Sequence, residues 1–117
     1  MPRTLRAALL LLALAAPARA EMLHMMEASP APRSVMQGPA QEFFVRFDGP
    51  VDHHASRLMI QRGDMVLRTL RPRLGASPNT LHAVAGGLPP GDYVLRWVVA
   101  PRAGGVPSMG GLDFSIR

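Results

Sequence analysis

Hydrophobic and polar residues alternate along several short stretches of this chain, the pattern of β-strands with one buried face. Over Gln41–Phe47 the alternation predicts a strand that ends at an Asp-Gly-Pro turn. The clearest alternation covers Tyr93–Val99, where every second residue is large and apolar. Because strand side chains point alternately to opposite faces, the only Trp and the only Tyr of the chain share one face. We therefore expect both aromatic rings in the core.

Weaker alternation between turn-forming residues predicts the remaining strands, and no window has the 3.6-residue period of a helix. These strands are expected near residues 23–28, 57–61, 65–71, 80–84 and 112–116, with the second and third pairing as a hairpin. About seven short strands, each with one face to bury, can bury those faces most simply by forming two packed sheets. We predict an all-β fold, an immunoglobulin-like antiparallel β-sandwich with Greek-key connections.

The N-terminus predicts a secretory signal peptide over residues 1–20. A short start with Arg3 and Arg6 precedes an unbroken Ala/Leu run, and Ala18-Arg19-Ala20 supplies the small residues of a cleavage site. The apolar run is about half of the ~20 residues that a membrane-spanning helix needs, so no stable membrane insertion is expected. The mature domain would then comprise residues 21–117 and lie in the periplasm.

Composition narrows the chemistry of the mature domain. With three arginines in the signal segment, the remaining arginines nearly balance the acidic residues, and no basic stripe with interleaved aromatics indicates nucleic-acid binding. The absence of cysteine excludes disulfides and thiolate metal sites. No nucleophile elbow, paired carboxylates or phosphate-binding glycine loop stands in a recognisable context, so we expect a binding protein and not an enzyme.

Three stretches resemble the CopC-like family of periplasmic copper-resistance proteins. They are residues 28–32 (Ala-Ser-Pro-Ala-Pro), residues 43–51 (ending Arg-Phe-Asp-Gly-Pro-Val) and residues 88–99 (Leu-Pro-Pro-Gly-Asp-Tyr-Val-Leu-Arg-Trp-Val-Val). The last is the most specific to the family. The resemblance implies a β-sandwich over the mature chain that binds copper ions in copper resistance or homeostasis. It often implies an inner-membrane copper-transport protein as partner.

The chain departs from this family at the metal ligands. Members that bind Cu(II) begin the mature chain with His and carry an Asp-x-His-Pro motif in the loop before the last strand. Here the mature chain would begin Glu21-Met22-Leu23-His24, and the loop over residues 100–111 contains neither Asp nor His. The Met-rich insertion that holds Cu(I) in other members is also missing. The resemblance therefore implies the fold more strongly than the metal site.

The strongest candidate metal ligands are Met22, His24 and Met26, assisted by Met109 from the loop before the last strand. Thioether sulfur is a soft neutral donor that favours Cu(I), and imidazole accepts either oxidation state, so this set predicts a Cu(I) site. Core packing is the competing interpretation for the methionines, above all for Met25.

Other candidates carry weaker signals. Asp52 with His53 or His54, expected in a loop, could hold Cu(II) or Zn(II) weakly, although exposed loop histidines are the simpler interpretation. His82 has no second donor nearby in sequence, and Met59 and Met65 flank the hairpin. Two functions stay open: a copper carrier with a Met/His Cu(I) site, and a metal-free domain whose surface engages a membrane or periplasmic partner.

Overall fold

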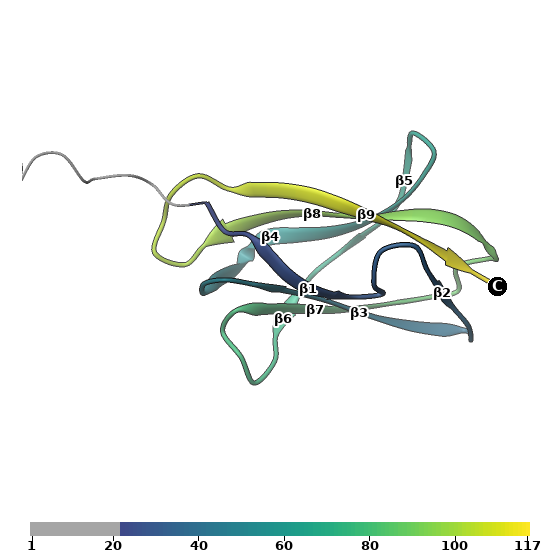
Figure 1. Ribbon diagram of the computed structural model, residues 1–117, viewed down its shortest axis with the longest axis horizontal. Helices are drawn as coiled ribbons and strands as arrows, with labels where there is room; N and C mark the ends of the chain where they lie inside the picture. The colour runs from purple at the N-terminus through teal and green to yellow at the C-terminus, as the bar shows by residue number, and fades with distance from the viewer. Residues whose placement is uncertain (1–21) are drawn as a thin grey trace, which may run out of the picture.

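A computed structural model describes residues 22–117, which form two β-sheets packed face to face (Figure 1). The predicted signal peptide lies outside the described residues. The four-stranded sheet has the order β1 (Met25–Ser29), β3 (Ala40–Phe47), β7 (Thr80–Gly86) and β6 (Arg73–Leu74). The five-stranded sheet has the order β2 (Ser34–Met36), β9 (Ser108–Ile116), β8 (Gly91–Pro101), β4 (Val51–Arg62) and β5 (Met65–Leu70).

The chain changes sheet at five connections, as in a Greek-key sandwich. They join β1 to β2, β2 to β3, β3 to β4, β5 to β6 and β7 to β8. The predicted all-β, immunoglobulin-like architecture is thus confirmed, with nine strands in place of about seven. The two extra strands are β2, with three residues, and β6, with two, which are too short to show a period in the sequence. In addition β2 pairs parallel to β9, so the five-stranded sheet is mixed and not purely antiparallel.

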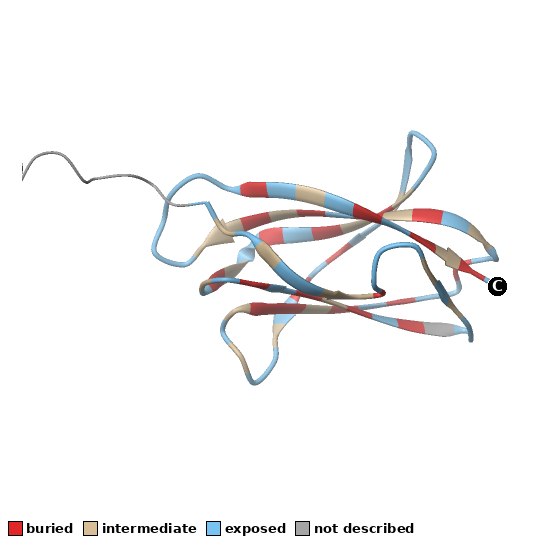
Figure 2. Ribbon diagram, in the orientation of Figure 1, coloured by how far each residue is buried: buried red, intermediate tan, exposed pale blue. Residues whose placement is uncertain are grey.

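The core lies between the sheets, where the inward residues of each strand meet (Figure 2). The aromatic residues expected there are all buried, and the Phe47 and Trp97 rings meet edge to face with centroids 6.3 Å apart. Leu58 and Ile60, two apart on β4, are both fully buried, as alternate residues of a strand with one buried face should be. The fully buried side chains include Phe43, Val45, Phe47, Val51, Leu58, Ile60, Leu81, Tyr93, Leu95, Val99 and Phe114.

The prediction that His53 and His54 lie in a loop is wrong, because β4 runs through both residues. The strand is irregular there, with a shift of its register against β8 between Asp52 and Arg57. The Asp52 Oδ1 accepts the backbone N–H groups of His54 and Ala55 at 3.1 and 3.3 Å. This carboxylate satisfies donors that the bulge removes from the ladder, so the strand continues through a sequence that resembles a loop.

Three segments meet at one end of the sandwich: the chain before β1, the β3–β4 turn and the β8–β9 loop (Figure 1). Buried Ser108 donates its Oγ–H to the carbonyl of Leu23 at 2.6 Å, and the Arg102 N–H donates to the carbonyl of Pro50 at 3.0 Å. Gly49 admits the Leu23 side chain, since a Cβ at Gly49 would lie 2.9 Å from Leu23 Cδ2. Within residues 22–117, no helix is long and apolar enough to cross a membrane.

Candidate metal centre

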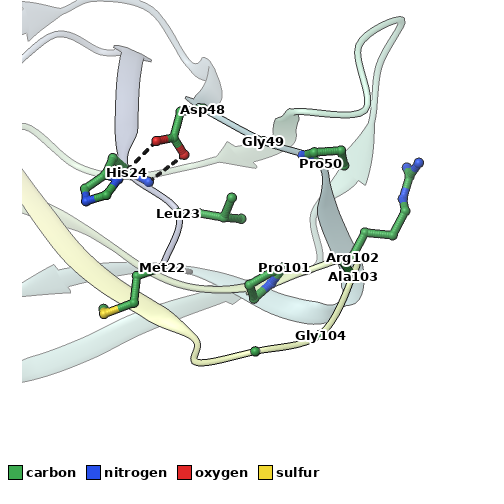
Figure 3. A pocket seen from close by; sticks show the side chains of 11 residues that line it. Met22, Leu23, His24, Asp48, Gly49, Pro50, Pro101, Arg102, Ala103 and Gly104 are labelled. Carbon is green, nitrogen blue, oxygen red and sulfur yellow. Dashed lines mark hydrogen bonds and ion pairs between the residues drawn. The ribbon is translucent and has the colours of Figure 1, made fainter. Parts of the chain in front are cut away.

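The largest hollow of the described chain lies at this end of the sandwich (Figure 3). The segment before β1 contributes Met22, Leu23 and His24, and the β3–β4 turn contributes Asp48 with the following glycine and proline. The β8–β9 loop closes the other side with residues 101–105. Residues distant in sequence thus surround one open space at the rim of the two sheets.

The segment entering β1 alternates between the core and solvent. Leu23 and Met25 pack against the core, as the competing interpretation expected for Met25, while Met22, His24 and Met26 are exposed. Figure 3 shows the Leu23 side chain on the opposite side of the segment from those of Met22 and His24. In an extended segment, residues two apart share a face. Met22 and His24 therefore lie on one accessible face, whereas exposed Met26 lies at a β-bulge, where the register against β3 shifts between Met25 and Glu27.

Asp48 holds His24 through two hydrogen bonds (Figure 3). The backbone N–H of His24 donates to Asp48 Oδ1 at 2.9 Å, and the ring Nδ1 lies 3.0 Å from Asp48 Oδ2. The Asp48 N–H in turn donates to the His24 carbonyl at 3.0 Å. Main chain and side chains together fix the imidazole against the β3–β4 turn, although the His24 side chain remains 76% exposed.

The Asp48 carboxylate sets the tautomer of this imidazole. The backbone N–H of His24, followed by the His24 side chain, holds the pKa of Asp48 below its usual value of 3.8, so the carboxylate is ionised at neutral pH. An ionised carboxylate only accepts hydrogen bonds, so the proton of a neutral His24 ring resides on Nδ1. The Nε2 lone pair then points away from Asp48. Metal-binding histidines commonly have their second nitrogen held by a carboxylate in this way.

The charges around the hollow nearly cancel. Among the described residues that line it, Asp48 is the only carboxylate and Arg102 the only guanidinium. Within the described part of the chain, no three His, Cys, Asp or Glu residues are grouped so that they could hold a metal ion. A metal bound here would therefore need ligands of another kind, and thioethers are the ones that lie near.

The four predicted ligands divide between the hollow and its surroundings. Met22 and His24 line the hollow, with Met22 49% exposed, whereas Met26 and Met109 lie outside its lining at 57% and 77% exposure. Met109 lies in β9 and not in the predicted loop, because residues 108–111 pair with β8 and place Met109 opposite Val98. The two glycines after Met109 have no side chains that could alternate between apolar and polar, so the sequence did not indicate the start of this strand.

Asp48 is the residue of the candidate site that sequence reasoning missed. It was interpreted only as the first residue of a turn, but the pairing of β1 with β3 places Met25 opposite Phe47. Continuing that antiparallel register by one residue places His24 opposite Asp48. The pairing of β1 with β3 was the signal from which the contact between His24 and Asp48 could have been predicted. His82 lies apart in β7, with its ring 6.0 Å from that of Phe44.

Comparisons with known proteins agree on the architecture. A family model described as the CopC domain matches residues 25–117. The crystal structure of CopC from Methylosinus trichosporium OB3b aligns with a TM-score of 0.72 at 22% identity, covering 80% of this chain and 92% of that chain. An engineered protein aligns with a TM-score of 0.59 at 20% identity, covering 87% of this chain and 21% of the other. At such identities the structural likeness shows the fold. No curated protein sequence matches the chain.

Proposed function

The chain belongs to the CopC domain family, and on that premise we propose that it is a non-enzymatic periplasmic copper-binding protein that holds Cu(I) at its N-terminal Met/His face. Copper is the cargo in this proposal. His24 and Met22 are the ligands at the hollow, and Met26 and Met109 are the thioethers that complete the set. Export by the signal peptide at residues 1–20 places the protein in the periplasm, where it serves copper resistance or homeostasis.

One observation carries this proposal: the orientation of His24 by Asp48. The carboxylate holds Nδ1 at 3.0 Å and leaves Nε2 free in the hollow that exposed Met22 also lines. A carboxylate behind a histidine fixes its ring and raises its basicity as a ligand. A histidine that is only exposed to solvent forms its hydrogen bonds with water and needs no carboxylate partner.

The choice of Cu(I) follows from the charges and the donors. Asp48 and Arg102 offset one another in the lining of the hollow. Two positive charges of Cu(II) would thus be poorly compensated, whereas Cu(I) brings one charge and prefers soft thioether ligands. Neutral imidazole is a ligand for either oxidation state and is therefore compatible with Cu(I). The proposed set accordingly differs in oxidation-state preference from a site built of several carboxylates and histidines.

Exposure of the methionines fits a carrier that exchanges its cargo. Met26 and Met109 are more than half exposed and have room to change rotamer. A ligand set at the rim of the sandwich is accessible to a second copper protein without unfolding of either sheet. We propose an inner-membrane copper-transport protein as that partner.

Chelator competition on the mature domain tests the proposal. The domain is titrated against a Cu(I)-specific chelator under reducing conditions and against a Cu(II)-specific chelator in air. We expect one equivalent of Cu(I) to be held more tightly than Cu(II). The double substitution Met22→Leu and Met26→Leu should abolish Cu(I) retention at little cost in stability, since Met-to-Leu changes roughly conserve volume.

The matched control replaces two methionines away from this face, Met59→Leu and Met65→Leu, and should leave Cu(I) retention unchanged. Undiminished Cu(I) retention in the Met22/Met26 double variant would show that the ligands lie elsewhere. If the parent protein retained neither ion, the metal-free partner-binding function would replace the copper function.

A further inference from the structure

A second hollow lies between β4 and the segment that ends β5, and it shares no lining residue with the N-terminal site. Its walls include His53, His54 and Arg57 from β4, with Thr69 and Arg71 from the other side. All five are polar side chains that can donate a hydrogen bond. None of the residues within 22–117 that line this hollow is a carboxylate. The hollow therefore offers hydrogen-bond donors and positive charge, whereas an acidic metal site offers carboxylate ligands and negative charge.

The β-bulge in β4 arranges these donors. Asp52 Oδ1 accepts the N–H groups of His54 and Ala55, and Ser56 Oγ donates to the Asp52 carbonyl at 2.6 Å while accepting the Ala100 N–H at 2.9 Å. In a regular strand the side chains of adjacent residues point to opposite faces. Here the His53 and His54 rings lie together, with centroids 4.0 Å apart and planes 37° from parallel.

The two arginines of this hollow have no acidic partner in the described chain. The three ion pairs within residues 22–117 involve other cations, namely His24, Arg46 and Arg117. Arg57 and Arg71 are exposed, and neither side chain makes a hydrogen bond with residues 22–117. Two unpaired guanidinium groups beside one hollow produce a positive local potential and leave planar donor forks free.

This charge argues against the Cu(II) or Zn(II) site that the sequence allowed at Asp52, His53 and His54. Both arginines would repel a divalent cation, and Asp52 is engaged with the backbone of the bulge. Guanidinium groups bind carboxylate and phosphate through two parallel hydrogen bonds, which are stronger than neutral ones. An anion with two or more oxygens would satisfy donors that nothing else in the described chain satisfies.

We propose that the hollow between β4 and β5 is a binding site for a compact oxyanion, a phosphate or carboxylate group, held by Arg57 and Arg71 with the paired imidazoles of His53 and His54 beside it. The anion would bridge β4 to the end of β5 through charge-assisted hydrogen bonds. The site is independent of copper binding.

Backbone NMR titrations of the mature domain test the site. Inorganic phosphate and citrate are added separately at constant ionic strength, and amide shifts are followed at residues 53–57 and 69–71. We expect saturable shifts confined to these residues with at least one anion. Saturation by phosphate alone assigns a phosphate ligand, and saturation by citrate alone assigns a carboxylate ligand.

The double substitution Arg57→Gln and Arg71→Gln should weaken that binding at least about tenfold, because each arginine contributes charge-assisted hydrogen bonds. Both side chains are exposed, so the variant should remain folded. The matched control, Arg68→Gln and Arg73→Gln, removes the same charge from exposed residues outside the hollow. It should bind like the parent.

Three results would overturn the proposal. Shifts that rise linearly without saturation would mean non-specific ion association. Equal weakening in both double variants would mean that net charge alone attracts the anion. Saturable Zn(II) binding at His53 and His54 without anion binding would restore the metal site. None of these results bears on the copper proposal, which rests on other residues.

Discussion

The pair formed by His24 and Asp48 is the smallest unit of the proposed function. Both side chains are accessible to water, at 76% and 39% exposure, and such pairs contribute little to stability because solvent screens them. Their geometry has a clearer consequence for ligand binding, because it fixes one tautomer and one ring orientation. A pair of this kind affects metal affinity more than folding.

The substitution Asp48→Asn tests this distinction between affinity and stability. Removing the carboxylate behind a ligating histidine typically lowers metal affinity by about 10- to 100-fold. We expect a loss of that size in Cu(I) affinity by chelator competition, with the fold intact by circular dichroism. Asp64→Asn, in the β4–β5 turn, is the control and should bind like the parent. Unchanged affinity in Asp48→Asn would remove Asp48 from the site.

The lowered pKa of Asp48 predicts a pH dependence of stability. A carboxyl group with a folded-state pKa below its unfolded value stabilises the fold above the unfolded pKa, and this contribution is lost as pH falls through the folded pKa. The difference in unfolding free energy between the parent and Asp48→Asn should be constant above about pH 5 and shrink below about pH 4. Urea unfolding at several pH values measures it. A difference that grew on acidification would contradict the assignment.

Strands long enough to show alternation could be predicted from the sequence, together with the face that each buries. The Tyr93–Val99 segment is the best case, because its large apolar residues recur at every second position and all lie in the core. Strands of two or three residues could not be predicted, since β2 and β6 are stabilised by pairing with β9 and β7 and not by their own pattern. Partner strands, not local sequence, define them.

The candidate site shows the same limit. Met22, His24 and Met26 could be chosen as donors because soft thioethers and an imidazole cluster at the mature N-terminus. Asp48 could not, because its role depends on the register between β1 and β3. The bulge in β4 could not be predicted for a related reason. The Asp52 side chain, and not a neighbouring strand, accepts the backbone N–H groups of His54 and Ala55 there.

The contact between β8 and β9 gives a prediction about the core. Trp97 is 6% exposed and lies opposite Gly110, where a Cβ would lie 2.5 Å from the Trp97 ring atom Cζ2. Trp97→Ala should cost about 3–5 kcal/mol of unfolding free energy. Gly110→Ala should cost about 1–3 kcal/mol through overpacking.

A double-mutant cycle separates this contact from other effects. In the Trp97→Ala background the space beside residue 110 is free, so Gly110→Ala should cost much less than it does alone. Guanidinium unfolding of the four proteins measures the coupling. Strictly additive losses would show that the glycine is required for a reason other than the indole ring.

At the scale of the whole molecule, the two hollows lie on separate sets of residues and have different chemistry. The described lining of the N-terminal hollow combines one carboxylate, one guanidinium, one imidazole and the Met22 thioether, whereas the described lining of the hollow at β4 and β5 has two guanidiniums, two imidazoles and no carboxylate. Under the two proposals, a single small sandwich carries copper at its rim and an oxyanion beside the bulge. Each site can be removed by substitution without disturbing the core.

Export is the prediction that places this molecule in its compartment. Expression of the full chain in a Gram-negative host should yield a periplasmic protein whose intact mass corresponds to a chain beginning at Glu21. Cleavage after Ala20 makes His24 the fourth residue, so it cannot form the amino-terminal copper motif that needs His in third position. A periplasmic protein that still began at Met1 would contradict the predicted cleavage.

The most direct test of the copper site is an NMR spectrum of the mature domain with ¹³C-labelled methionine methyl groups, recorded before and after one equivalent of Cu(I). Coordination changes the chemical shift of a methyl group bonded to the ligating sulfur. We predict that the resonances of Met22, Met26 and Met109 shift, while those of Met25, Met36, Met59 and Met65 stay unchanged. Unshifted Met22 and Met26 resonances in a copper-loaded sample would contradict the account.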